Sequence, residues 1–545
     1  MGRKYMTDIP DLETRLRKID AIFARWDTCH APGLIVGIAQ HGRTIYRRAF
    51  GMASLEAGVA NTPATRMRIG STSKHFLALT ALLLQEEGKV DLDDPIGRYL
   101  PELTGDGGRP SLRQLLGHRG GIRCHLDLGF LARGMMAPPV GSGLALLARQ
   151  VGGNFAPGEA MIYCNAGYHL ISLAVERVTG RPLADVLRER FFDPMGMAAT
   201  SLVASDFTIT PGMAGLHLPS PDGTWRRGLF PSRELLGEGG IVSTIDDMLV
   251  WLAHLRTRER FGSADTWRQL TAVTGEPNGD AGYYALGLVV SRYRGLGTLG
   301  HPGGVVGGSS EMICIPALGL DIVILCNGAK DAFPMLLAQQ VLDVLLSDRL
   351  GEQASAVTMA RYAPNLGDYA STETGLIYGL EQQGDTLLLR VAKCPDAIGL
   401  EVAPDGWLQT GISFLGQIRL QVSAQDREGI VVEFAGERKR YTRLGSPPAG
   451  LQGLPLDGVY YSEECGVGAE FYRSGSSAVL RTWDHWGSAE LDVIPLGGEW
   501  LFVRSREAPE EFGAVIHFDD HAGGRRRFRL SSARTRALTF TATKP

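Results

Sequence analysis

The alternation of apolar and polar positions predicts a helix and a β-hairpin at the start of the chain. Residues 11–26 place apolar side chains at helical spacing, which is the pattern of an amphipathic helix. The stretch from Gly33 to Ala39 is apolar and partly β-branched, and His41-Gly42 separates it from a second strand-like run. A turn dipeptide between two such runs indicates a hairpin.

Strands and helices return toward residue 350. Residues 286–290 and 321–325 are predicted to be central strands of a sheet, and residues 333–350 carry the apolar spacing of an amphipathic helix. Residues 164–192 are predicted to be helical, with apolar positions that mark buried faces. Because helices and strands occur at both ends of residues 1–350, we predict one α/β (α+β) domain whose two ends share a sheet.

A different pattern starts after Leu350, where predicted helix almost disappears and short alternating segments lie between glycines. This part also repeats itself. Residues 367–375 match residues 458–466 at Gly, Tyr, Ser, Glu and Gly, and further identities share the same offset of 91. We predict two related all-β domains, residues 351–450 and 451–545, each an antiparallel barrel of the lipocalin-like kind that leaves no sheet edge open.

Composition narrows the class of protein. With 44% hydrophobic and 21% charged residues over 545 positions, the chain is typical of soluble globular proteins with several domains. A net charge of −4 gives no reason to expect nucleic acid or a membrane as partner. No secretory signal and no apolar stretch long enough to span a membrane is visible, so we expect a cytoplasmic protein. The seven cysteines lack metal-ligand spacing, which predicts reduced thiols, no metal and no cofactor.

The most informative chemical motif is Ser71-Thr72-Ser73-Lys74, which directly precedes an apolar helix closed by Gly88. Residues three apart on a helix share one face, so Lys74 can reach the Ser71 hydroxyl. Free backbone N–H groups at a helix N-terminus also favour developing negative charge. A serine needs a base to become a nucleophile, and a desolvated lysine can serve as that base. Because the same tetrapeptide also fits an ordinary helix cap, its meaning depends on partners elsewhere in the chain.

The first candidate partner is Tyr163-Cys164-Asn165, at the start of a predicted helix. A tyrosine held near a lysine ammonium can carry protons between a nucleophile and a leaving group. Asn165 offers both a donor and an acceptor, which suits the binding of a substrate amide. A packed tyrosine and a helix-capping asparagine would account for the same residues.

The second candidate partner is His301-Pro302-Gly303-Gly304, near the last predicted strands. Gly303 and Gly304 allow a substrate backbone to approach closely, and the Gly304 N–H can donate to an oxyanion. His301 can line a pocket as a switchable polar group, although a solvated loop histidine is the plainer interpretation. Pro302 donates no hydrogen bond, so it should occupy an edge position.

In this order, the three motifs resemble the serine β-lactamase and penicillin-binding protein superfamily, whose pattern is Ser-x-x-Lys, Tyr-x-Asn and Lys/His-x-Gly. The resemblance covers roughly residues 10–350 and includes further segments: residues 90–96, 115–122, 180–183, 194–197 and 239–244. Tyr-x-Asn is typical of the class C-like branch. Within that branch, Tyr-Cys-Asn, His-x-Gly and two C-terminal barrels are similar to D-stereospecific aminopeptidases.

The resemblance implies a serine hydrolase that releases N-terminal D-amino acids from peptides, amides or esters through an acyl-enzyme. It implies the following site residues: Ser71, Lys74 and Tyr163 as catalytic groups, and Asn165, His301, Gly303 and Gly304 as substrate-binding groups. The implied partner is a small substrate with a free N-terminal amine, and a homodimer is left open. In that family a loop of the last barrel blocks longer substrates, and by position residues 503–512 correspond to it.

Two alternatives stay open at this point. One is a short-chain esterase, a D,D-carboxypeptidase or a β-lactamase-like hydrolase on the same catalytic domain. The other is a binding or sensory protein that captures a ligand without turnover, which the complete set of three motifs argues against.

Overall fold

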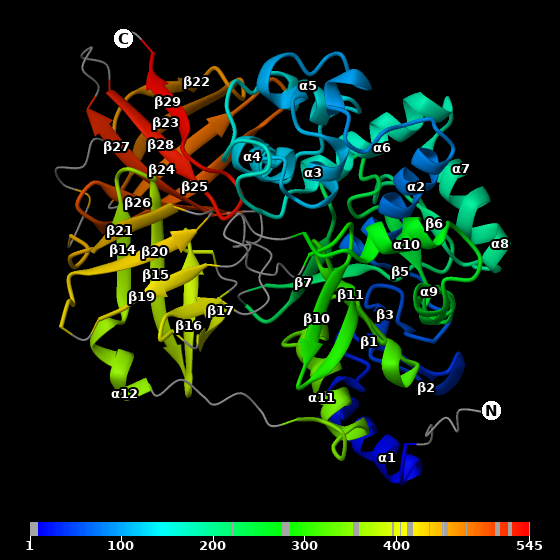
Figure 1. The fold of residues 1–545 in the computed structure, drawn as a ribbon. Helices are drawn as coiled ribbons and strands as arrows, with labels where there is room; N and C mark the ends of the chain where they lie inside the picture. The colour runs from blue at the N-terminus through cyan, green and yellow to red at the C-terminus, as the bar shows by residue number, and fades with distance from the viewer. Residues whose placement is uncertain are drawn as a thin grey trace. The chain divides into compact units, whose positions relative to one another are not determined.

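The computed structural model describes residues 9–543, apart from residues 221, 275–283, 352–358, 395–396, 404, 411–417, 424, 435–436, 449–450, 452–455, 476, 507–512 and 521–525. The described residues fall into two compact units. The sheet unit comprises residues 9–92, 171–274 and 284–351, and the barrel unit comprises residues 93–170 and 359–543. Figure 1 shows the labelled helices and strands of both units.

The sheet unit is built on a six-stranded antiparallel sheet in the order β10-β11-β12-β13-β1-β2. Its strands are β1 (Leu34–Gln40), β2 (Arg43–Phe50), β10 (Val289–Tyr293), β11 (Leu296–Val305), β12 (Gly308–Ile315) and β13 (Leu320–Cys326). The N-terminal hairpin turns at His41 and Gly42, with φ values of 51° and 78°. Because β1 pairs with β13, the prediction that both ends of this part share one sheet is confirmed.

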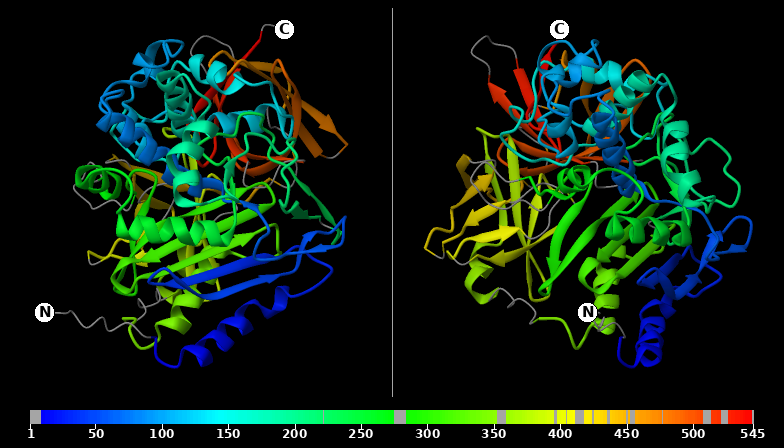
Figure 2. Two further views of the ribbon diagram at one scale, coloured as in Figure 1. Left: turned by 90° about the vertical axis from the view of Figure 1, so that its right-hand side faces the viewer. Right: turned by 45° about the vertical axis from the view of Figure 1, so that its right-hand side comes forward.

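Helices cover both faces of this sheet. Helices α1 (Leu12–Phe23) and α11 (Pro334–Leu345) bury apolar side chains against one face, together with Val36 and Ile38 of β1. Side chains alternate along a strand, so Gly37 faces the other side, where it lies close to α9 (Ile245–Thr257). Figure 2 shows α1, in dark blue, running along the sheet. The predicted N-terminal and closing helices are therefore confirmed.

The remaining elements of the sheet unit are short or lie around the sheet. The helices are α2 (Lys74–Glu86), α7 (Leu183–Leu187), α8 (Asp193–Met195) and α10 (Ala264–Thr271). The strands are β3 (Met52–Ser54), β4 (Val59–Ala60), β5 (Met67–Arg68), β6 (Ser201–Leu202), β7 (Leu216–Pro219), β8 (Trp225–Gly228) and β9 (Ile241–Ser243). Strand β9 pairs with both β5 and β6 and so forms a small second sheet beside the start of α2.

The predicted central strand over residues 286–290 is wrong. The strand in this region, β10, begins at Val289 and occupies the edge of the sheet. Gly287 explains the difference, because its backbone is left-handed with φ of 73°. A Cβ at Gly287 would lie 2.6 Å from the Lys74 carbonyl oxygen, so this apolar run bends against α2 instead of extending.

The barrel unit contains two closed antiparallel barrels of eight strands each, which confirms the predicted fold class. The first consists of β14 (Gly367–Ser371), β15 (Leu376–Gln383), β16 (Thr386–Val391), β17 (Ile398–Val402), β18 (Leu408–Thr410), β19 (Arg419–Gln421), β20 (Gly429–Phe434) and β21 (Glu437–Arg443). The second consists of β22 (Val459–Ser462), β23 (Val467–Ser474), β24 (Ser477–Trp483), β25 (Ser488–Gly497), β26 (Trp500–Ser505), β27 (Ala514–Asp520), β28 (Arg526–Ser531) and β29 (Leu538–Ala542). The domain boundaries near residues 350 and 450 stay a prediction.

Residues 93–170 add a helical part to the barrel unit, drawn in blue to cyan in Figure 1. Its helices are α3 (Leu112–Leu116), α4 (His125–Arg133), α5 (Ser142–Ala148) and the first residues of α6 (Asn165–Thr179), and α12 (Met359–Tyr362) precedes the first barrel. Leu128, Leu131 and Leu146 share one apolar core with the second barrel. Among the helices described, none combines the length and the apolar character needed to span a bilayer.

Candidate active site

The structure brings Ser71 and Lys74 together within the sheet unit. Ser71 lies in a single 3-10 turn, Gly70–Ser73, which leads directly into α2. Lys74 Nζ lies 3.0 Å from Ser71 Oγ and donates to the Glu238 carbonyl oxygen at 2.6 Å. The Lys74 side chain is completely buried, so its amine is held in one place beside the hydroxyl. The spacing of the motif therefore gives the distance that a serine nucleophile and a lysine base would need.

Strands β11 and β12 pack against the turn that carries Ser71. The Ser310 hydroxyl donates to the Ile69 carbonyl at 2.9 Å, and the Thr72 hydroxyl donates to the His301 carbonyl at 3.0 Å. Gly70 has φ of 52°, and a Cβ there would lie 2.6 Å from the Gly304 backbone nitrogen. The close approach of Gly70 and Gly304 thus brings the Gly304 N–H, the predicted oxyanion donor, next to the turn that carries Ser71.

Pro302 occupies the edge position that its missing N–H requires. Strand β11 pairs with β10 only as far as Gly300, whereas its pairing with β12 continues to Val305. Residues 301–305 therefore form a one-sided extension of the sheet. The His-x-Gly motif lies on this extension, and Gly304 is exposed there.

His301 lies inside the sheet unit with no exposed surface. Its Nε2 lies 3.0 Å from the Tyr284 hydroxyl, and its Nδ1 lies 2.5 Å from the Pro302 carbonyl oxygen. Burial, together with the charges of Lys74 and His75, holds the pKa of His301 well below its usual range. The Nδ1 proton then points to the carbonyl, so Nε2 accepts from Tyr284. His301 is a neutral, fixed group, and its role in substrate binding stays a prediction.

Tyr163 and Asn165 belong to the barrel unit. Asn165 is the first residue of α6, which confirms the predicted helix start, and its side chain is half-buried. The Tyr163 side chain is almost completely buried. Its ring packs on the His118 imidazole with the ring centroids 4.2 Å apart.

His118 holds the Tyr-x-Asn segment in place. Its carbonyl accepts from the Ile162 N–H at 3.1 Å, and its Nδ1 accepts from the Cys164 N–H at 3.1 Å. An Nδ1 that accepts a hydrogen bond places the proton on Nε2, which makes the imidazole neutral. His118 adopts φ of 58°, a strained value for a residue with a side chain. The sequence resemblance included the segment around His118, but no spacing rule showed that it touches Tyr163.

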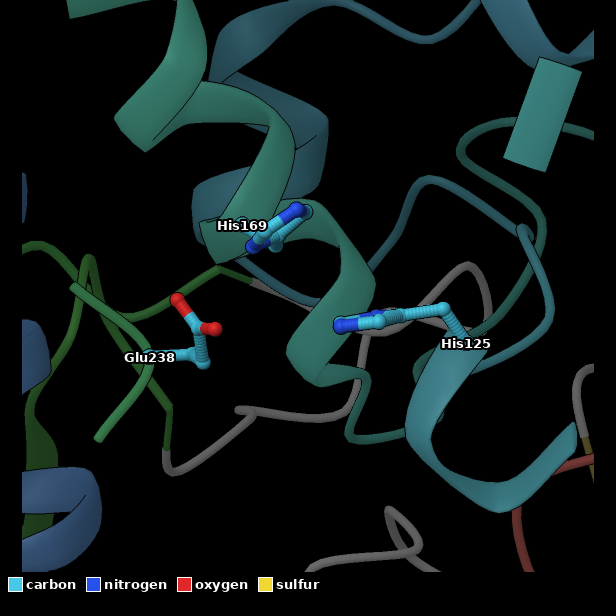
Figure 3. Close-up of side chains that lie close together, drawn as sticks. All are labelled: His125, His169 and Glu238. Carbon is cyan, nitrogen blue, oxygen red and sulfur yellow. The ribbon is translucent and has the colours of Figure 1, made fainter. Parts of the chain in front are cut away.

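A pair of histidines lies nearby in the same unit. His125 of α4 and His169 of α6 face each other with ring centroids 4.6 Å apart. Figure 3 shows this pair and also labels Glu238 of the sheet unit. Burial, followed by the charges of His169 and Arg133, holds the pKa of His125 well below its usual range. Two imidazoles of one unit do not by themselves complete a metal centre, and the absence of a metal stays a prediction.

Comparison with known proteins decides the family. The family model described as Beta-lactamase matches residues 19–346, which include all three motifs. This chain belongs to the beta-lactamase family. Its membership, together with the Ser71–Lys74 geometry, makes it a serine hydrolase.

Within the beta-lactamase family, the chain is similar to D-aminopeptidases along almost its whole length. It is 30% identical to the D-aminopeptidase of Brucella anthropi over 530 residues, which cover 94% of each chain. Two solved structures share the fold. The octameric penicillin-binding protein homologue from Pyrococcus abyssi has a TM-score of 0.55 at 22% identity and covers 80% of this chain and 100% of its own. The D-amino acid amidase from Ochrobactrum anthropi SV3 has a TM-score of 0.52 at 24% identity, and the match covers 62% of this chain and 99% of the amidase.

Proposed function

We propose that this chain is a D-aminopeptidase that releases an N-terminal D-amino acid through an acyl-enzyme on Ser71. The observation that carries the proposal is the 3.0 Å approach of Lys74 Nζ to Ser71 Oγ at the start of a buried helix. The substrate class is supported by the relative that matches 94% of each chain and is named a D-aminopeptidase. Peptides, amides and esters with a free N-terminal amine are the proposed substrates.

The proposed reaction begins when the Ser71 hydroxyl attacks the carbonyl carbon of the first residue. Lys74, together with Tyr163, takes the hydroxyl proton, and Tyr163 passes a proton to the nitrogen that leaves. The Ser71 and Gly304 N–H groups stabilise the oxyanion, a contribution of about 3 kcal/mol for one such donor. Water then attacks the ester, with Tyr163 or Lys74 as base, and the free D-amino acid departs.

The remaining site residues are proposed to bind the substrate. Asn165 offers its side-chain amide to the substrate amide, and Gly303 leaves room for the substrate backbone. His301 is also proposed to line the site, as a neutral imidazole whose two nitrogens contact Tyr284 and the Pro302 carbonyl. The loop proposed to exclude longer substrates, residues 503–512, lies outside the described residues from 507 onward. A homodimer and a cytoplasmic location stay predictions.

Turnover of a small set of anilides tests this proposal. D-alanine p-nitroanilide should be hydrolysed, whereas its N-acetyl form and L-alanine p-nitroanilide should be poor substrates. Faster hydrolysis of the N-acetyl form would contradict the aminopeptidase assignment. Rapid hydrolysis of nitrophenyl butyrate without any anilide turnover would favour the short-chain esterase instead. Ser71→Ala is the control, because loss of the nucleophile should remove turnover in every case.

A further inference from the structure

The helical part of the barrel unit contains a cavity of about 270 Å³. Its described lining residues all lie between Leu103 and Leu170, and neither Tyr163 nor Asn165 is among them. The end of α5, labelled in Figure 1, and the loops at residues 120–122 and 152–157 form much of the lining. Exposed residues also line the cavity, so it is open to solvent. It is a concave site within a single unit.

The two loops that line this cavity pack closely against each other through their backbones. The Asn154 N–H donates to the Gly121 carbonyl at 2.7 Å. Gly121 has φ of 70°, and a Cβ there would overlap the Phe155 carbonyl oxygen. A Cβ at Gly153 would lie 2.5 Å from the Gly121 carbonyl oxygen. Since no side chain fits between the two backbones, this wall of the cavity has a defined shape.

Gln150 is the buried polar side chain of the lining. It follows α5 by two residues, and its N–H donates to the Leu147 carbonyl at 3.3 Å. Only 6% of the residue is exposed. Its Nε2 and Oε1 are both buried, and neither has a hydrogen-bond partner among the described residues. A buried amide in this state destabilises the protein until another group pairs with it.

The other polar side chains of the described lining already have partners. Asn154 Nδ2 donates to the Arg534 carbonyl at 2.9 Å, and its Oδ1 accepts from the Arg536 N–H at 2.9 Å. Asp106 and Arg109, both exposed, form an ion pair at 3.0 Å. The rest of the lining consists of glycines and apolar side chains, of which these are buried: Leu103, Ile122, Leu147 and Leu170. A ligand would therefore meet one unpaired carboxamide within an apolar surface.

The chemistry of a carboxamide selects the class of ligand. Gln150 offers an N–H donor and an oxygen acceptor side by side in one plane, so a ligand that offers an acceptor beside a donor satisfies both. A primary carboxamide does this. A trans peptide bond directs its N–H and C=O to opposite sides, so a peptide backbone pairs with only one of the two atoms. A carboxylate brings acceptors alone, and burial of its charge is unfavourable.

We propose that this cavity is a binding site for a small, neutral primary carboxamide, whose amide pairs with Gln150 through two hydrogen bonds and whose apolar body packs on the leucines of the lining. Pockets for drug-sized ligands measure roughly 300–1,000 Å³, so the volume of this cavity suits a smaller molecule. The proposal does not depend on the reaction at Ser71, because none of the proposed catalytic residues lies in the described lining.

The test is isothermal titration calorimetry of the full chain with benzamide, which joins one carboxamide to one apolar ring. Benzamide has no α-amine, so the proposed aminopeptidase reaction does not consume it. We expect saturable binding of one benzamide per chain. N,N-dimethylbenzamide has no N–H and benzoate has no donor, so both should bind at least about tenfold more weakly.

Gln150→Met places the site, because methionine has a similar length but cannot form either hydrogen bond. Benzamide should bind this variant at least about tenfold more weakly, and it should raise the thermal unfolding midpoint of the wild-type protein only. Without ligand, the variant should unfold at a higher temperature than the wild-type protein, because it buries no unpaired amide. Gln383→Met, at an exposed position of β15, is the matched control and should bind benzamide like the wild-type protein.

Three results would overturn the proposal. The first is equal affinity of the wild-type protein for benzamide and N,N-dimethylbenzamide, which needs no variant. The second is unchanged benzamide affinity in a folded Gln150→Met, which would place benzamide elsewhere. The third is no benzamide binding up to about 10 mM. None of these measurements involves turnover, so they are separate from the anilide assays that test the proposed D-aminopeptidase activity.

Discussion

Glu311 gives the sheet unit a stability that should depend strongly on pH. It lies on β12 between Pro302 of β11 and Ile324 of β13, and only 5% of its surface is exposed. Burial raises the pKa of Glu311 from 4.5 to about 8, although the Met312 backbone N–H favours the charged form. The neighbouring Ser310 hydroxyl donates to Ile69, next to the turn that carries Ser71, so Glu311, one residue along the strand, faces away from that turn.

The size of the effect follows from the two pKa values. Between pH 4.5 and about pH 8 the folded protein keeps a proton on Glu311 that the unfolded chain has lost. Folding then takes up one proton, and the free energy of unfolding falls by about 1.4 kcal/mol for each pH unit. Over the whole interval the loss reaches about 5 kcal/mol as an upper bound. The loss is complete only above pH 8, where the carboxylate is charged in both states.

Glu311→Gln replaces the carboxyl with a neutral amide of the same shape and should remove this dependence. At pH 5 we expect urea unfolding to show a difference in the free energy of unfolding between the variant and the wild-type protein, since the amide needs its own hydrogen bonds. This contribution should be the same at every pH. As the pH rises to 9, the free energy of unfolding of the variant should rise relative to that of the wild-type protein, by about 5 kcal/mol at most. Glu259→Gln, at an exposed position, is the control and should show no such gain. A difference between Glu311→Gln and the wild-type protein that is the same at every pH would refute the reasoning.

Two further predictions follow from contacts in the two units. Gly70→Ala adds a methyl group 2.6 Å from the backbone of β11, so we expect fluorophosphonate labelling of Ser71 to fall at least about tenfold. Gly88→Ala is the control, because Gly88 also has a positive φ, 67°, but no atom of the described residues lies near its added Cβ. This variant should lose only about 1–2 kcal/mol of stability and leave labelling unchanged. Arg133→Ala leaves the buried Asp484 without its charged partner and should lower the stability of the barrel unit by about 3–5 kcal/mol in urea unfolding. A much smaller loss than in the double variant Arg133→Met with Asp484→Leu would contradict that account.

The sequence predicts those parts of the fold that depend on local patterns. The hairpin at His41-Gly42 was predictable because both residues favour the left-handed backbone that its turn requires. The offset of 91 that relates the two halves of the tail also relates β15 (Leu376–Gln383) to β23 (Val467–Ser474) residue by residue. The strand over residues 286–290 was predicted wrongly because its apolar residues are buried for a different reason. They pack against α2 around a glycine that no periodicity distinguishes from a strand residue.

The candidate site likewise contains contacts that sequence spacing predicts and contacts that it does not predict. Ser71 and Lys74 lie within one helical turn, so their approach follows from spacing alone. The contact between the Ser310 hydroxyl and the Ile69 carbonyl joins residues 241 positions apart, and the sequence carries no signal of it. His118 lies 45 positions before Tyr163, and the contact between their rings depends on a positive φ at His118 that no sequence pattern predicts.

The identity of the nucleophile is the claim on which the whole account depends. Its most direct test is peptide mapping after reaction with a fluorophosphonate, followed by turnover of D-alanine p-nitroanilide. The account predicts one modified peptide, containing Ser71, and a parallel loss of turnover. Ser73→Ala, which removes a buried hydroxyl that accepts from the Ile241 N–H at 3.1 Å, should still be labelled, whereas Ser71→Ala should be neither labelled nor active. Full turnover by Ser71→Ala, or labelling at another residue, would contradict it.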